Sequence, residues 1–226
     1  MDFRHTKLSF SRSLTSYSKV QRIYSNAIRG NPLQFRRKWL IAKPFLNIGC
    51  GEQHNPAFIN LDYNWVPGVD LCWDLETNAL PFPPSSIEGV FTEHCLEHLS
   101  FGGAQRLLLD LYRILKPGAT LRIVVPDAEL YIRLYCEWKV GMQPTFPDGQ
   151  PSQVNQSFFS PIMPVNAIFR NYGHRYAYDY DCLALLLRTC SFSHIQRCEF
   201  SRGRNPTLLI DTEARRLESL VVEATK

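Results

Sequence analysis

The feature that most constrains this chain is a short apolar segment that runs into a pair of glycines. Residues 46–51 read Leu-Asn-Ile-Gly-Cys-Gly, and a second apolar segment ends at Asp62. Glycines at positions 49 and 51 permit backbone angles that other residues avoid, and they let the backbone approach a ligand closely. A carboxylate at the end of the second segment can accept hydrogen bonds from both hydroxyls of a ribose. The stretch therefore indicates a nucleoside cofactor, although a G-x-G pattern alone does not say which one.

Further motifs follow in a fixed order. They are Asp74-Leu75, Leu-Pro-Phe-Pro at 80–83, the apolar strand 89–92, Glu-His-Cys-Leu-Glu-His-Leu at 93–99, Ile-Leu-Lys-Pro-Gly at 114–118 and the apolar strand 120–127. With these motifs the chain resembles the class I S-adenosylmethionine (SAM) dependent methyltransferases. It is most similar to the type-11-like group of predicted methyltransferases linked to glycan and cell-surface pathways. The resemblance covers roughly residues 44–128, and ordered motifs are more specific than the G-x-G pattern alone.

The resemblance implies a set of cofactor-binding residues. They are Asn47, Gly49, Cys50, Gly51, Asp62, Asp74, Leu75 and Glu93. The glycine turn would pass under the methionyl part of SAM, with its backbone amides facing the ligand. Asp62 would hold the ribose hydroxyls, and Asp74 with the N–H of Leu75 would hold the adenine.

The expected chemistry needs few catalytic groups. Methyl transfer from a sulfonium is an in-line displacement for which positioning supplies much of the rate. A hydroxyl acceptor gains from a histidine base, and His94 is the first candidate because it lies just past the fourth strand. His174 is a second candidate, and Glu93 would instead steer an amine acceptor. We expect the acceptor to be bound by Asp127, Tyr131, His174 and Arg175.

The same segment admits a metal interpretation. His94 and His98 are four residues apart, on one face of a helix, with Glu93 and Glu97 beside them. The order differs from the His-Glu-x-x-His pattern of zinc proteases, and no third ligand is evident in the sequence. We therefore expect no metal, and we expect His98 to brace the fold through hydrogen bonds.

The order of elements predicts an α/β fold of the Rossmann-like class I methyltransferase type. We expect a mostly parallel twisted sheet with a C-terminal antiparallel hairpin and helices on both faces. Strands are predicted near 45–48, 58–62, 69–72, 88–92, 120–125, 194–200 and 206–211, and helices near 14–29, 34–41, 95–98, 103–115 and 183–188, with 141–172 irregular because of its prolines. Only residues 52–60 separate the glycine turn from the second strand's end, too few for the usual long helix.

Charge divides the chain into two parts. Residues 1–43 contain ten of the 25 Lys and Arg residues but one of the 21 Asp and Glu residues. We therefore expect a basic helical N-terminal arm at 1–43 and a single domain at 44–226, with a substrate-region insertion at about 128–180 that is rich in aromatic residues. Apolar residues in the arm recur at helical spacing. The arm would pack on the domain, contact an anionic acceptor or membrane surface, or be a cleaved transit peptide.

These patterns favour methyl transfer to a hydroxyl of a small-molecule or glycan-type acceptor. The alternatives are an N-methyltransferase, a SAM-binding partner subunit without turnover, and a nicotinamide oxidoreductase; the last lacks the third glycine and the long helix. The seven cysteines form no C-x-x-C pair, which favours a reducing cytoplasm. No apolar run of ~18 residues is present, and no nucleic-acid-binding module is recognisable.

Overall fold

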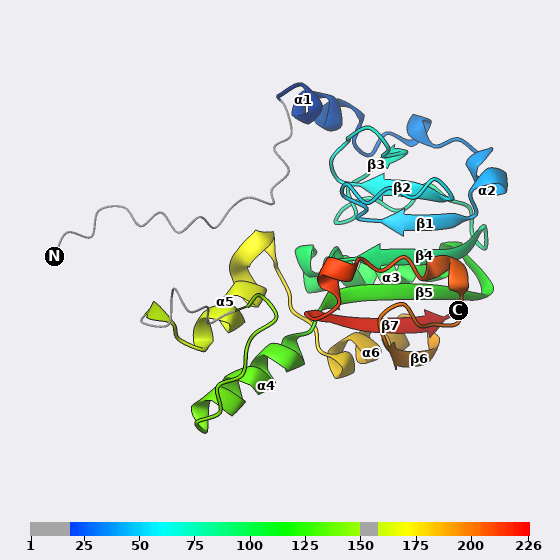
Figure 1. The fold of residues 1–226 in the computed structure, drawn as a ribbon. Coiled ribbons are helices and arrows are strands. Elements are labelled where there is room, and N and C mark those ends of the chain that lie inside the picture. Colours follow the sequence, from blue (N-terminus) through cyan, green and yellow to red (C-terminus); the bar gives the residue numbers. More distant parts are fainter. Residues whose placement is uncertain (1–18, 150–157) are drawn as a thin grey trace.

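The computed structural model describes residues 19–149 and 158–226. Its centre is a seven-stranded sheet with the order β3-β2-β1-β4-β5-β7-β6. The strands are β1 (Phe45–Ile48), β2 (Phe58–Asp62), β3 (Leu71–Cys72), β4 (Ile87–Glu93), β5 (Leu115–Pro126), β6 (Ser193–Cys198) and β7 (Ser219–Thr225). The first five strands are parallel, whereas β7 pairs antiparallel with both β5 and β6. In Figure 1 the arrowheads of β1, β2 and β4 point left and that of β7 points right, so the predicted sheet, mostly parallel with an antiparallel hairpin, is confirmed.

The helices are mostly short. They are α1 (Lys19–Ile28), α2 (Trp39–Ala42), α3 (Phe101–Ile114), α4 (Ala128–Lys139), α5 (Ile162–Arg170) and α6 (Tyr180–Thr189), with 3₁₀ turns η1 (Pro32–Gln34), η2 (Leu96–His98), η4 (Asn171–Gly173), η5 (Pro206–Leu208) and η6 (Glu213–Arg215). Side-chain oxygens of Ser100 and Asp179 accept from backbone amides at the starts of α3 and α6, which satisfies donors that a helix leaves free. Helix α5 lies inside a stretch predicted to be irregular, and that prediction is wrong because its prolines, 161 and 164, fall at the cap and in the first turn, where proline is tolerated.

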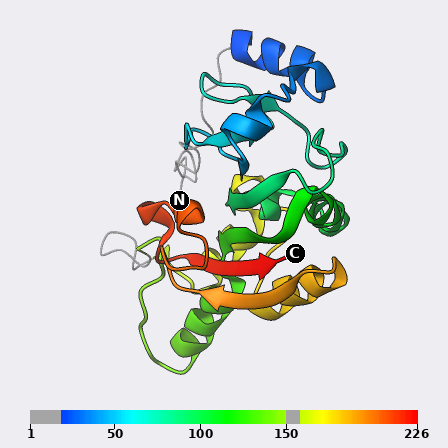
Figure 2. The ribbon, with the colours of Figure 1, turned by 90° about the vertical axis from the view of Figure 1, so that its right-hand side faces the viewer.

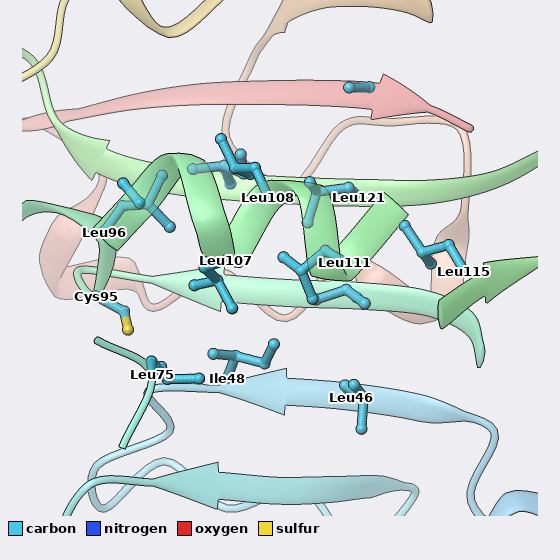
Figure 3. Close-up of a cluster of buried hydrophobic side chains, with 14 of the residues drawn as sticks. Leu46, Ile48, Leu75, Cys95, Leu96, Leu107, Leu108, Leu111, Leu115 and Leu121 are labelled. Atoms are coloured by element: carbon cyan, nitrogen blue, oxygen red, sulfur yellow. The ribbon is translucent and has the colours of Figure 1, made fainter. Parts of the chain in front are cut away.

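One face of the sheet carries the main core. Leucines of α3, including Leu107 and Leu111, pack on Leu46 and Ile48 of β1, as Figure 3 shows. Leu183 and other buried residues of α6 join the same cluster. Side chains alternate between the two faces of a strand, so Leu46 and Ile48 both point to this face.

The opposite face is covered by a long C-terminal connection with two 3₁₀ turns. No α-helix follows β1 or β2, because the connections 49–57 and 63–70 are too short for the long helices usual there. The segment 199–218, which includes η5 and η6, lies over this face instead (Figure 2). Leu208 of η5 is fully buried against Phe58 and Phe91 in a second, smaller cluster.

A buried ion cluster fixes this covering segment. Arg122 of β5 is fully buried and donates through Nε to Oδ1 of Asp211 (2.7 Å) and through Nη1 to Oε1 of Glu223 (2.9 Å). Its Nη1 also donates to the backbone carbonyl of Arg202 (3.0 Å). A Cβ at Gly203 would lie 1.9 Å from a carboxylate oxygen of Glu223, so the segment passes close over the cluster and needs glycine there.

The predicted closing strand at 206–211 is wrong. Pro206 and Asn205 start the turn η5 there, with the Asn205 side chain accepting from Thr207 N. The partner of β6 is β7, a run of β-prone residues that is buried between two strands. Segment 199–218 is therefore a long connection across the sheet face instead of a tight hairpin turn.

The described part of the N-terminal arm contacts the β3 edge of the sheet (Figure 1). The hydroxyl of Ser25 in α1 accepts from Trp65 N (2.9 Å), and Gly30 N donates to Cys72 O (3.2 Å). Apolar side chains of α1 stay exposed: Val20 is 75% and Ile23 is 70% accessible. The helix predicted at 34–41 is replaced by η1 and α2, and residues 14–18 of the predicted first helix lie outside the described residues. Within the described residues no helix is long and apolar enough to span a bilayer.

Candidate functional site

The glycine turn begins directly after β1. Gly49 and Gly51 both adopt left-handed backbone angles, with φ of 67° and 51°. The amides of Gly49 and Cys50 both donate to Leu61 O, at 2.8 and 3.1 Å, which ties the turn to β2. A Cβ at position 49 would lie 2.5 Å from the Cβ and Sγ atoms of Cys95, whereas no heavy atom of the described residues lies within 4 Å of a Cβ at position 51. Gly49 is therefore needed for packing, and Gly51 faces free space.

Asp62 ends β2 beside this turn. Its Oδ2 accepts from Gly51 N at 2.9 Å, and its Oδ1 accepts from Asn64 N at 2.8 Å. Burial raises the pKa of this carboxyl above its usual range, while the two backbone hydrogen bonds act in the opposite direction. Each carboxylate oxygen has a second lone pair, so the group can still accept from a ligand hydroxyl. The structure thus brings together the glycine pair and the acidic residue that the sequence singled out.

Two of the predicted cofactor residues are engaged within the protein. The Nδ2 of Asn47 donates to Gln53 O (2.8 Å) and to Asn60 Oδ1 (3.2 Å), and Asn47 is 3% exposed. Cys50 is buried, and its thiol pKa is raised by that burial, with the Asp62 charge adding to the effect. These side chains shape the turn, and direct contact between them and a cofactor stays a prediction.

Asp74 and Leu75 follow β3 at the same end of the sheet. Oδ1 of Asp74 accepts from Glu76 N at 2.9 Å, and Leu75 is buried. A cavity of about 390 Å³ lies between residues 75–79 and helix α3. Among the predicted cofactor residues only Leu75 lines this cavity. The predicted adenine contact of this pair stays a prediction.

Glu93 and His94 follow at the end of β4, and residues near the C-terminus hold both. Thr212 donates to the two carboxylate oxygens of Glu93, from its backbone N (2.9 Å) and from its hydroxyl. His94 Nε2 lies 2.8 Å from Ser219 Oγ, and His94 has a φ of 47°. Burial lowers the pKa of His94 to about 3, and the positive charge of Arg215 adds to this shift, so the imidazole is neutral at neutral pH.

A cluster of imidazoles surrounds Glu97 in η2. Oε1 of Glu97 lies 3.6 Å from His94 Nδ1, 4.0 Å from His98 Nε2 and 3.9 Å from His174 Nε2. The Glu97 backbone carbonyl accepts from the amides of Arg175 and Tyr176, which pins the later segment to η2. The sequence contained each of these residues, but no local spacing indicated that His174 reaches the group.

The four predicted acceptor-binding residues do not form one group, because each contacts different partners. Asp127 caps α4 by accepting from Leu130 N (3.3 Å), and it forms an ion pair with Arg197. Tyr131 is buried in an apolar cluster of α4 and α5, and Arg175 Nη1 lies 3.4 Å from Glu76 Oε2. Of the four residues, only His174 joins the group around Glu97, so acceptor binding by the others stays a prediction.

The chain is similar, at low sequence identity, to solved structures of methyltransferases. A SAM-dependent methyltransferase of Archaeoglobus fulgidus is 16% identical over 91% of this chain and 94% of its own, with a TM-score of 0.47. A Thermotoga maritima structure, described as a possible histamine N-methyltransferase, is 17% identical over 90% and 92%, with the same TM-score. A Burkholderia thailandensis N1-methyltransferase with bound S-adenosylhomocysteine is 15% identical over 92% and 78%, with a TM-score of 0.44. No protein-family model and no curated protein matches the sequence.

The fold itself is the predicted one. The sheet is Rossmann-like and mostly parallel, with one antiparallel strand, β7, inserted between β5 and β6, as predicted. Strand order reverses between β1 and β4, and in open α/β sheets ligands bind in the crevice outside the carboxyl ends of strands at such a point. Asp62 and Glu93 are the last residues of β2 and β4 at this end, and the glycine turn and His94 directly follow β1 and β4.

Proposed function

We propose that this protein binds SAM at the carboxyl ends of β1, β2 and β3 and transfers its methyl group to an acceptor. The observation that carries the proposal is the hydrogen bond from Gly51 N to the Asp62 carboxylate, beside a turn that presents an open face. A carboxylate held in place by the backbone of a glycine turn suits a ribose next to a close-fitting methionyl chain. Bound SAM would supply an activated methyl group.

The chain's own residues would position the two reactants. Gly51 lets the backbone approach the cofactor, and Asp62 orients its ribose through the hydroxyls. Glu93 and His94 lie at the end of the adjacent strand β4, where an acceptor would meet the methyl group. Thr212 and Ser219 hold these two side chains, so the geometry at this point depends on the C-terminal segment.

The proposed acceptor is a hydroxyl of a small-molecule or glycan-type compound. Aromatic side chains of the segment 128–180 that remain accessible, such as Phe169 and Tyr172, offer flat faces that suit sugar rings. Replacement of His94 by Asn, a residue that tolerates a positive φ, should leave SAM affinity unchanged and slow methyl transfer. Transfer to amines alone would instead support the N-methyltransferase alternative, and SAM binding without any turnover would support a partner-subunit role.

The N-terminal arm is proposed to contact an anionic surface. Exposed Val20 and Ile23 lie on α1 together with Lys19 and Arg22, the combination that basic amphipathic helices use at membrane interfaces. Binding of the protein to vesicles with anionic lipid should weaken as salt is added. Salt-independent binding, or no binding, would remove this role.

Calorimetry is the direct test of the cofactor. The purified protein should bind SAM and S-adenosylhomocysteine but not NAD. A screen with radiolabelled methyl-SAM against glycans and small hydroxyl compounds then tests transfer. Tight NAD binding with no SAM binding would overturn the proposal, since it would assign the glycine turn to a dinucleotide.

A further inference from the structure

We infer that Glu97, His98 and His174 form a binding site for one divalent transition-metal ion. The metal-binding atoms of these three side chains all lie within 4.8 Å of one another. In a tetrahedral zinc site with bonds of about 2.0–2.1 Å, neighbouring ligand atoms are about 3.3 Å apart. The distances of 3.9 and 4.0 Å from Glu97 Oε1 to the two Nε2 atoms exceed this value by under 1 Å. The ligand atoms of His98 and His174 lie within 4.8 Å of one another, so side-chain rotations would bring all three atoms to coordinating distance.

The unpartnered carboxylate of Glu97 points to a missing ligand. Its side chain is 1% exposed, and neither Oε1 nor Oε2 has a hydrogen-bond partner among the described residues. A buried carboxylate without partners costs free energy unless it is neutralised or coordinates a metal.

The imidazole of His174 is oriented with a lone pair toward this carboxylate. His174 Nδ1 lies 2.7 Å from Ile168 O. A carbonyl only accepts, so Nδ1 carries the proton and Nε2 of the neutral ring has the free lone pair. Metal-binding histidines characteristically donate their other ring N–H to such a carbonyl.

The backbone pre-forms the arrangement. Glu97 and His98 belong to the same 3₁₀ turn, and the segment carrying His174 is fixed by two hydrogen bonds to Glu97 O, from Arg175 N (2.7 Å) and Tyr176 N (3.1 Å). The rings of His98 and His174 meet edge to face, with centroids 5.0 Å apart. A ligand from a distant segment is thus brought to η2 by backbone contacts that do not depend on the metal.

The ligand set indicates the kind of ion. Two imidazoles and one carboxylate occur in catalytic zinc sites and in non-haem iron sites, both of which leave positions for water or a substrate oxygen. The His98 side chain is 40% exposed, which provides an entry path from solvent. His94 Nδ1, 3.6 Å from Glu97 Oε1, lies next to the ligands without belonging to the group of three. This inference concerns ion binding alone and stands apart from methyl transfer.

Metal titration of the full chain tests the site. We expect the apo protein, prepared with a chelator, to bind one equivalent of Zn²⁺ by calorimetry and one of Co²⁺ by visible absorption, with a rise in Tm that grows with metal concentration. Glu97→Gln keeps the shape but removes the charged ligand, and His174→Ala removes the distant ligand. Each variant should weaken binding at least tenfold, a loss typical of disturbed metal sites.

The controls separate this site from other metal-binding groups. His194→Asn removes an exposed histidine of β6 at a positive-φ position that asparagine tolerates, and Cys136→Ser removes an exposed thiol; both variants should bind as the wild type does. Circular dichroism shows whether each variant is folded, and if His174→Ala does not fold, Glu97→Gln decides. The absence of stoichiometric binding by the wild type, or unchanged binding by folded Glu97→Gln, would overturn the inference.

Discussion

The backbone N–H of Gly51 donates to Oδ2 of Asp62 at 2.9 Å, so the glycine turn after β1 and the acidic end of β2 form one unit. Under the proposed function the same carboxylate accepts from the ribose of SAM. Asp62→Ala should reduce SAM affinity roughly ten- to a hundredfold, because a hydrogen bond to a charged group contributes about 1.5–3 kcal/mol. Calorimetry measures this loss. Asp181→Ala, an exposed acidic residue of α6, is the matched control and should bind normally.

The two glycines of the turn separate packing from ligand binding. Gly49→Ala places a Cβ 2.5 Å from two atoms of Cys95, and it should lower the Tm markedly because that buried side chain has no room to move. The Cβ added by Gly51→Ala meets no heavy atom of the described residues. The substitution should lower the free energy of unfolding only by the roughly 1–2 kcal/mol that a side chain costs in a left-handed backbone, but it should weaken SAM binding strongly. Differential scanning calorimetry and SAM titration of both variants test the contrast. Equal SAM affinity in Gly51→Ala and wild type would place the cofactor elsewhere.

Binding of SAM should depend on pH through Asp62. Burial raises the pKa of this carboxyl, so the folded ligand-free protein keeps the proton to a higher pH than the unfolded chain does. The contribution of Asp62 to the stability of the ligand-free protein is therefore lost as the pH rises through the raised pKa. SAM should favour the ionised form, which accepts from both ribose hydroxyls, so affinity should fall as the pH drops below the raised pKa. Calorimetry at a series of pH values should show this dependence in the wild type and none in Asp62→Asn.

The sequence predicted the sheet and the position of the glycine turn beside Asp62 well because both depend on short local patterns. An apolar strand followed by Gly-x-Gly, and an aspartate at the end of the next strand, specify their own positions. The failures arose where contacts are distant in sequence. The segment 206–211 is apolar enough to resemble a strand, but Arg122 and the sheet face hold its neighbourhood as a covering loop. No local period connects His174 with Glu97, so their approach appears only in the folded chain.

Arg122 should be the most sensitive charged position for stability. Its guanidinium and the carboxylates of Asp211 and Glu223 are almost completely buried, and removal of one partner leaves the other charges without compensation. Arg122→Met should therefore lower the free energy of unfolding by about 3–5 kcal/mol, measured by urea denaturation. Arg202→Met is the matched control because the Arg202–Glu199 pair is exposed, and an exposed pair contributes about 0–1 kcal/mol.

Arg122→Met should also change the position of Glu93 in the candidate site. Asp211 precedes Thr212, which donates to both carboxylate oxygens of Glu93, so loss of the Arg122 contact would release the residue that holds Glu93 at the end of β4. In a folded Arg122→Met variant we expect slower methyl transfer with SAM affinity close to that of wild type. The glycine turn follows β1 and is hydrogen-bonded to β2, whereas the ion cluster joins β5, β7 and the covering segment. Unchanged transfer together with the predicted loss of stability would show that the covering segment stabilises the sheet without positioning Glu93.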